Sequence, residues 1–128
     1  SISTSDERDK TDFTDLNIGL DFVKSLKPYT FRWDKRHKYI DWDKNPDTDL
    51  NSITNDGTHK DAQLDLGFKA QEVEALEVAA GYKKEDETNL VIDLTDDGTK
   101  YGIKYEKLVP ILVKAIQELE ARVKELEG

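Results

Sequence analysis

The chain of 128 residues lacks cysteine and methionine, and only 36% of its residues are hydrophobic whereas 37% are charged. Without cysteine it forms no disulfide, no thiolate nucleophile and no zinc ribbon. No apolar run approaches the ~20 residues that a membrane-spanning helix needs. Because one domain of this composition has little apolar surface to bury, we expect an elongated or oligomeric molecule.

The charge balance is acidic, with 28 Asp and Glu against 19 Lys and Arg and a formal net charge of -9 at pH 7. The basic residues are interleaved with acidic ones, and an acidic protein repels both nucleic-acid phosphates and anionic lipid. We therefore expect neither nucleic acid nor a membrane as a partner. The chain starts with serine rather than methionine, and residues 1–15 carry no signal-like apolar stretch, so we expect a piece of a longer protein.

The first half of the chain alternates between polar and ordered stretches. Residues 1–15 have almost nothing to bury and predict a loop or an arm. The apolar positions of residues 16–26 fit a short amphipathic helix that is stopped by Pro28, and the β-formers of residues 29–33 predict a strand. Residues 34–65 are rich in turn signals and predict a long, polar, projecting loop.

The second half predicts a helix, a hairpin and a further helix, so the fold class is α+β. Residues 70–80 have helical spacing and are followed by Gly81, a plausible C′ residue. Residues 90–94 and 100–105 read as the two strands of a β-hairpin, in which Gly98 supplies the positive φ of the turn.

Residues 106–127 are the most periodic part of the chain and predict a C-terminal helix. Their apolar residues are spaced alternately three and four apart, as in the a/d pattern of a coiled coil. These residues are Val109, Leu112, Ile116, Leu119, Val123 and Leu126. The β-branched residues at a with Leu at d favour two strands, whereas Leu108, Val113 and Ala115 widen the seam and favour three strands or packing on a domain.

This helix is too short to be stable alone in water, since it holds fewer than three heptads. It must therefore be stabilised by packing against a globular neighbour. One alternative is a single amphipathic helix that lies on its own core. Pro110 is best tolerated in the first turn, which places the helix start near residues 105–107.

A calcium loop is suggested by the spacing of Asp47, Asp49 and Asn51. The sixth position of that loop is Ser52 rather than glycine, and the twelfth is Thr58 rather than glutamate, so the pattern fails. We expect no metal and no cofactor.

Four stretches of the chain carry motifs that occur together, in this order, in one family. Residues 5–10 read Ser-Asp-Glu-Arg-Asp-Lys, and residues 19–33 contain a helix, Leu-Lys-Pro and an aromatic strand. Residues 67–74 read Gly-Phe-Lys-Ala-Gln-Glu-Val-Glu, and residues 105–119 begin the terminal helix. The set resembles the intramolecular chaperone and self-cleaving serine peptidase domain at the C-termini of phage endosialidases, tailspikes and neck appendages. Residues 34–65 and 82–89 align with nothing in that family.

The resemblance implies an intramolecular chaperone that forms a homotrimer, with its C-terminal helices in a helical bundle or coiled coil. Its folding client is the preceding fibre segment of its own chain, which it holds in register while a β-fibre folds. Residues 1–5 are then the end of the parent fibre chain, and residues 6–128 are the chaperone domain. The resemblance also implies assembly in the host cytoplasm and release from the mature virion fibre after one cut.

The resemblance places the cut between Ser5 and Asp6, with Ser5 as nucleophile and Lys10 as base. A lysine whose pKa is lowered by burial can take the serine proton, so this Ser-Lys dyad needs no histidine. His37 and His59 are far from Ser5 in the sequence, and we expect both to be solvated loop residues.

The geometry of the cut leaves two routes open. Attack by the Ser5 hydroxyl on its own carbonyl would close a strained four-membered ring, so a cut after Ser5 requires attack from another chain or a less direct path. Attack on the preceding carbonyl of Thr4 would instead be a five-membered acyl shift.

Two other functions compete with this interpretation. One is a structural trimerisation cap without peptidase activity, in which Ser5 and Asp6 only cap a helix. The other is a substrate-binding module of a larger enzyme. Residues 34–65 are predicted to be the projection that grips the unfolded fibre.

Overall fold

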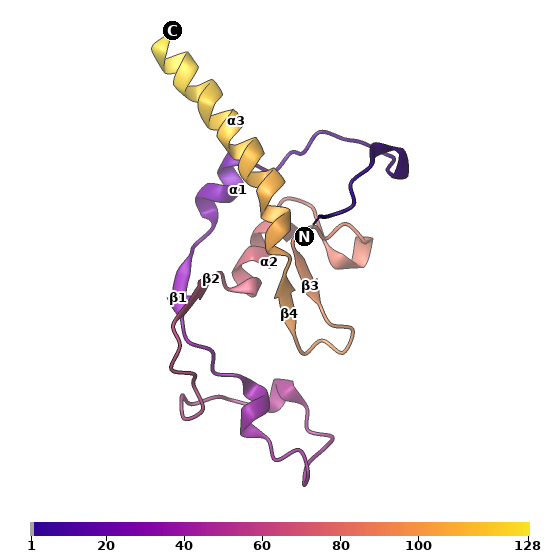
Figure 1. The fold of residues 1–128 in the computed structure, drawn as a ribbon, viewed down its shortest axis with the longest axis vertical. Coiled ribbons are helices and arrows are strands. Elements are labelled where there is room, and N and C mark those ends of the chain that lie inside the picture. The colour runs from indigo at the N-terminus through magenta and orange to yellow at the C-terminus, as the bar shows by residue number, and fades with distance from the viewer. Residues whose placement is uncertain (1) are drawn as a thin grey trace.

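A computed structural model describes residues 2–128; Ser1, the first residue of the predicted fibre segment 1–5, lies outside the described residues. Within residues 2–128 the fold is α+β, as expected, and consists of three α-helices and two antiparallel two-stranded sheets. The elements are α1 (Leu20–Ser25), β1 (Tyr29–Phe31), β2 (Asp65–Gly67), α2 (Ala70–Ala79), β3 (Ile92–Leu94), β4 (Tyr101–Ile103) and α3 (Leu108–Glu127). The molecule is elongated, with α3 extending from one end and residues 34–62 from the other (Figure 1).

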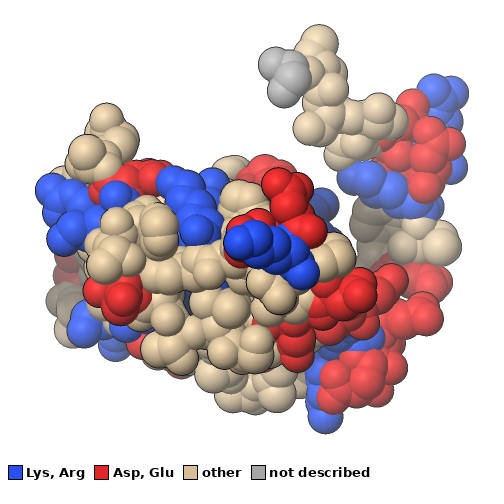
Figure 2. Space-filling view, turned by 90° about the horizontal axis from the view of Figure 1, so that it is seen from below, with Lys and Arg blue, Asp and Glu red and all other residues tan. Residues whose placement is uncertain are grey.

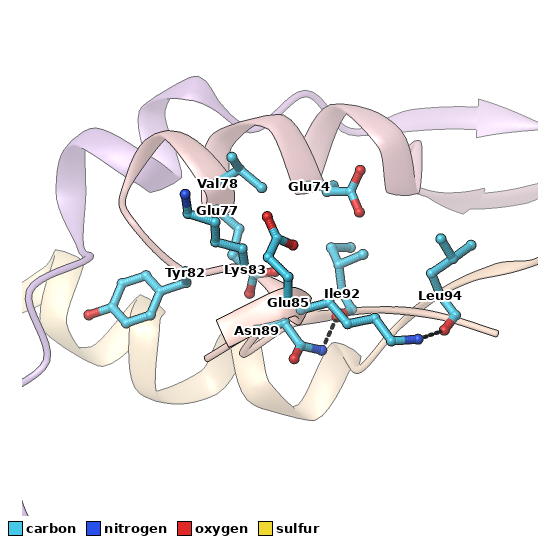
Figure 3. A pocket seen from close by; sticks show the side chains of 10 residues that line it. Glu74, Glu77, Val78, Tyr82, Lys83, Glu85, Asn89, Ile92 and Leu94 are labelled. Carbon is cyan, nitrogen blue, oxygen red and sulfur yellow. Dashed lines mark hydrogen bonds between the residues drawn. The ribbon is translucent and has the colours of Figure 1, made fainter. Parts of the chain in front are cut away.

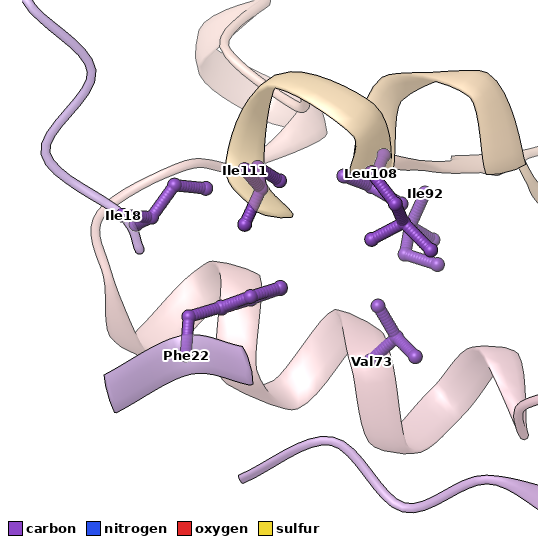
Figure 4. Close-up of a cluster of buried hydrophobic side chains, with 7 residues drawn as sticks. Ile18, Phe22, Val73, Ile92, Leu108 and Ile111 are labelled. Atoms are coloured by element: carbon purple, nitrogen blue, oxygen red, sulfur yellow. The ribbon is translucent and has the colours of Figure 1, made fainter. Parts of the chain in front are cut away.

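One hydrophobic core joins elements that are far apart in the sequence (Figure 4). Its buried side chains come from the segment before α1, from α1, α2 and α3, and from β3 with the residue before it. They are Ile18, Phe22, Val73, Val91, Ile92, Leu108 and Ile111. The core therefore forms only when both halves of the chain have come together.

Helix α1 is shorter than the helix predicted over residues 16–26. It starts after Gly19, and the Oε1 atom of Glu118 on α3 accepts a hydrogen bond from the Leu20 N–H at 3.4 Å. A side chain at Gly19 would collide with Glu118 and would lie 2.8 Å from Lys114 Cγ. The start of this helix therefore packs closely against α3.

Helix α2 and the β3–β4 hairpin agree with the sequence prediction. Gly81 follows α2 with φ +98°, and Gly98 has φ +74° in the hairpin turn, so the predicted positive φ values are confirmed. Asp97 stabilises the same turn, since its carboxylate accepts hydrogen bonds from Thr95 and Thr99. These bonds lower the pKa of Asp97 to about 2.

Strands β1 and β2 pair across a long excursion of the chain, with Tyr29 opposite Gly67 and Phe31 opposite Asp65. We call residues 34–62 between them the projection. Sequence patterns predict a polar loop here, and the structure adds two 3₁₀ turns, Arg36–Tyr39 and Leu50–Ser52.

The projection is held by polar contacts instead of an apolar core. The Tyr39 hydroxyl donates to Asp34 Oδ1 at 2.6 Å and accepts from the Gly57 N–H at 3.1 Å, while its ring contacts His59 edge-on. Arg36 and Asn51 attach the projection to the hairpin turn, because their side chains donate to the backbone carbonyls of residues 99 and 98.

Helix α3 has two apolar faces. Leu108, Ile111 and Ala115 are buried, and the N-terminal part of the helix packs on α1 and the core. The other face is exposed and consists of the predicted a/d residues Val109, Leu112, Ile116, Leu119, Val123 and Leu126. The start of α3 thus lies on the chain's own core, as in the alternative of a single amphipathic helix, but through Leu108, Ile111 and Ala115 and not through the a/d residues.

The start of α3 is close to the prediction. The helix begins at Leu108, after a 3₁₀ turn at Tyr105–Lys107, and not at residue 106. Pro110 lies in its first turn, where its missing N–H breaks no helical hydrogen bond.

On the face shown in Figure 2, Lys and Arg are interspersed with Asp and Glu. In the described part of the chain, no helix combines the length and the apolar character required to cross a bilayer.

Candidate functional site

The predicted catalytic residues lie in an exposed arm, residues 2–15, that loops away from the body beside α3 (Figure 1). One tight turn is the regular element of this arm. Asp6 is the N-cap of a 3₁₀ turn at Glu7–Asp9, in which the Asp9 N–H donates to the Asp6 carbonyl at 3.1 Å. The Lys10 N–H donates to the Glu7 carbonyl at 3.2 Å, and the chain is thereby reversed.

This turn brings Ser5 and Lys10 together. Lys10 Nζ donates a hydrogen bond to Ser5 Oγ at 2.6 Å, which is within the reach needed for proton transfer. Because the contact spans only five residues, it depends on the turn and on no other part of the molecule. Both residues are exposed.

Asp6 and Arg8 fix the conformation of the turn. The Asp6 carboxylate accepts from the Arg8 backbone N–H at 2.9 Å and from the Arg8 guanidinium at 2.7 Å. The Arg8 guanidinium, together with that N–H, lowers the pKa of the Asp6 carboxyl, and the carboxylate in turn raises the pKa of Arg8. Sequence reasoning gave Arg8 no role, although Asp at an N-cap is a recognised signal.

The chemistry available here is that of a serine hydroxyl beside an amine. A lysine serves as a base only when its neutral form is populated, and burial favours that form. Within residues 2–128, no side chain from outside the arm hydrogen-bonds to residues 2–15. Water therefore has free access to the pair in the single chain.

An apolar groove, which sequence reasoning missed, lies where β1 and β2 meet the residues before α3. It has a volume of about 480 Å³ and is lined mainly by Pro28, Tyr29, Leu66, Gly67, Phe68 and Tyr105. The Phe68 and Tyr105 rings stack at 6.1 Å, and the Tyr105 hydroxyl accepts from the Phe68 N–H at 3.2 Å. The Tyr29 hydroxyl donates to Glu72 Oε1 at 2.7 Å, so Glu72 lies beside the groove.

A second hollow, of about 460 Å³, lies between α2 and β3 (Figure 3). Its buried carboxylate is Glu77, which is 1% exposed and accepts from the N–H groups of Leu90 and Val91 at 2.7 and 2.6 Å. Lys84 donates to the Leu94 carbonyl. These groups join α2 to the hairpin, so the polar residues of this hollow have a structural role.

The other residues examined in the sequence take structural roles. His37 and His59 are exposed in the projection, where they contact Trp42 and Tyr39, as expected for solvated loop residues. Asp49 caps the 3₁₀ turn at Leu50–Ser52. No cluster of His, Asp and Glu in the described residues is arranged to hold a metal ion.

Comparison with protein families identifies the chain. A family model described as chaperone of endosialidase, named Peptidase_S74, matches residues 5–82. The chain belongs to this family. The match begins at Ser5 and contains three of the four motifs, whereas α3 lies outside it. The family's name marks it as a chaperone and as a member of the serine peptidase class. No curated protein and no solved structure matches the chain.

Proposed function

We propose that this chaperone domain forms a homotrimer, assists folding of the fibre segment that precedes it in its own chain, and then releases itself by one cut after Ser5. The hydrogen bond between Lys10 Nζ and Ser5 Oγ carries the catalytic part of the proposal. The family match supports it as well, because it starts at the nucleophile. Residues 1–5 then belong to the fibre, and residues 6–128 are the released chaperone.

Trimerisation is supported by the exposed apolar face of α3. Ile116 is 66% exposed and Leu126 is 89% exposed, and both lie on the heptad stripe. Burying such a stripe between helices is the usual driving force of a coiled coil. The adjoining face already anchors the start of α3 in the core, so the body supplies the stability that a short helix lacks.

In the cleavage reaction, Lys10 takes the proton from Ser5 Oγ, and the oxygen attacks the Ser5 carbonyl of a neighbouring chain. An ester forms, the Asp6 amine leaves with the proton that Lys10 returns, and water then hydrolyses the ester. The whole reaction consumes one water and breaks the C–N bond between Ser5 and Asp6. The new carboxylate stays on Ser5, and the new amine is that of Asp6. Attack by the Ser5 hydroxyl of another chain predicts a cut between Ser5 and Asp6. An acyl shift at Thr4 predicts a cut between Thr4 and Ser5.

The test uses the domain expressed behind its own fibre segment. Gel electrophoresis and intact-mass measurement compare wild type with Ser5→Ala and Lys10→Ala, with Ser3→Ala and Lys24→Ala as controls at exposed positions. We expect cleavage in wild type and both controls, and none in the two dyad variants. The proposal fails if all variants are cut or if all stay intact in the assembled trimer. The mass of each fragment identifies the bond.

The alternative function is a non-catalytic trimerisation cap. It is favoured by the role of Asp6 as an N-cap, because capping alone explains an exposed Ser-Asp pair. In that case wild type stays intact in the trimer. A binding module of a larger enzyme would instead be monomeric in light scattering.

A further inference from the structure

The arm exposes an aromatic residue that the single chain leaves uncovered. Phe13 is 71% exposed, and every described residue from 2 to 15 is exposed. The neighbouring Asp12 has φ +57°, a left-handed conformation that is uncommon outside glycine, so the arm holds a defined bend at this point. The ring is therefore free to contact a surface outside its own chain.

The apolar groove offers a matching surface. Leu66 at its rim is 76% exposed, although it is a large aliphatic residue. Two cations flank the Tyr29 ring, with Lys27 Nζ at 5.2 Å and Lys69 Nζ at 4.7 Å from its centroid. Glu72, bonded to the Tyr29 hydroxyl, is an acidic group at this site.

The arm has the complementary character. Phe13 lies between Asp12 and Asp15, so an aromatic ring is flanked by carboxylates. The ring suits the apolar lining of the groove, and the carboxylates suit the two lysines beside it.

The arm and the groove are on opposite sides of the molecule. In Figure 1 the arm lies to the right of α3, whereas β1 and β2 lie to the left. The two surfaces therefore do not meet in one chain. A contact between different surfaces of neighbouring copies closes into a ring under a threefold rotation.

We propose that residues 12–15 of one copy dock in the apolar groove of a neighbouring copy, with Phe13 against the aromatic lining and the flanking carboxylates near Lys27 and Lys69. The inference rests on the proposed trimer. Lys10 is only three residues from Phe13, so docking also covers the dyad. A covered dyad is no longer open to bulk water, and cleavage thus waits for assembly.

The test is intermolecular cross-linking, which is simple because the chain has no cysteine. The full chain carries Thr14→Cys, beside the intact Phe13, together with Leu66→Cys, two exposed positions, and is treated with a short bismaleimide. The control pairs Thr14→Cys with Val78→Cys, which is exposed on α2 away from the groove. Light scattering on the same samples reports the oligomeric state.

We expect covalent dimers and trimers from the Thr14–Leu66 pair and few from the control. A trimer in which the Thr14–Leu66 pair cross-links no better than the control overturns the docking and leaves the proposed trimer intact. A cross-link confined to one chain also overturns the docking. A monomer overturns both.

A second measurement tests the link with cleavage. In the domain behind its fibre segment, Phe13→Ser should slow self-cleavage at least about tenfold while the trimer persists. Phe13→Tyr should restore most of the rate, and Ile2→Ser, a change at a fully exposed residue elsewhere in the arm, should leave it unaltered. An unaltered rate in a trimeric Phe13→Ser variant contradicts the coupling.

Discussion

The arm and the body of this domain are held by different kinds of contact. In the body, Val91 is fully buried and Ile111 is 2% exposed, and the core joins helices from both halves of the chain. In the arm every described residue up to Asp15 is exposed, and one capped turn places Lys10 on Ser5. Folding stability therefore resides in the body and the proposed chemistry in the arm, so mutations should separate the two.

The largest effect on stability is expected within α3, where two isoleucines face opposite environments. Ile111→Ala should lower the free energy of unfolding by about 2–5 kcal/mol, because it leaves a cavity in the core. Ile116→Ala, at a residue that is 66% exposed, should weaken only the associated state. Urea titrations at low and high protein concentration measure both changes. Equal losses at both concentrations for Ile116→Ala would contradict the assignment of the two faces.

Glu77→Ala should have the next largest effect. It removes the acceptor of the buried Val91 N–H, at about 1–3 kcal/mol for an unsatisfied group, and of the part-buried Leu90 N–H, which water can partly satisfy. Glu77→Gln keeps an acceptor oxygen and should lose less. Chemical unfolding compares both with Glu85→Ala, a change at an exposed residue on the same hollow. If Glu77→Ala is as stable as that control, the carboxylate does not hold α2 to the hairpin.

Gly67→Ala should cost about 1 kcal/mol. A Cβ atom here would lie 2.5 Å from the Tyr105 hydroxyl oxygen, which would move and lose its bond from the Phe68 N–H. Gly102→Ala is the matched control in β4, where the described chain places no heavy atom within 4 Å of the new Cβ. Thermal unfolding of both variants is the measurement, and a larger loss for Gly102→Ala would be the contrary result.

Asp6→Ala should have the smallest effect on stability and a clear effect on the arm. The body should unfold as in wild type, but loss of the cap frees Lys10 from Ser5 and slows cleavage. Asp9→Ala is the control, because Asp9 lies in the same turn but does not form the cap. A lower melting temperature for Asp6→Ala would show that arm and body are coupled.

The same turn should respond to pH in one direction. Because Arg8 lowers the pKa of Asp6 below its ordinary value of 3.8, the cap is complete above that value and is lost as pH falls through the lowered pKa. Carboxyl NMR chemical shifts of Asp6 follow this titration.

Local features of the fold could be predicted from the sequence. The β3–β4 hairpin, the positive φ of Gly81 and Gly98, and the nearness of Ser5 and Lys10 all depend on residues close together in the chain. Turn geometry and helix ends are determined by such neighbours. The motif at residues 5–10 also pointed to the family, which the match over residues 5–82 then showed.

Long-range features could not be predicted. Glu118 accepts from the N–H at the start of α1, and Glu77 accepts from the N–H groups before β3. Helix patterns place both glutamates on a solvated face, so the sequence gives no sign of either contact. The sequence predicts only a polar loop for the projection, because its contacts are polar and join residues far apart in the chain, such as the Asn51 side chain and the Gly98 carbonyl.

Helix α3 shows most directly what the sequence determined and what the tertiary structure decided. The heptad spacing by itself established a helix with an apolar stripe, since that spacing repeats on one side of any α-helix. The tertiary structure decided which face the body buries, because Leu108, Ile111 and Ala115 meet the core while Val109, Ile116 and Val123 face solvent. Periodicity cannot make that choice, since burial of either face removes apolar area from water and only the shape of the neighbouring elements distinguishes them.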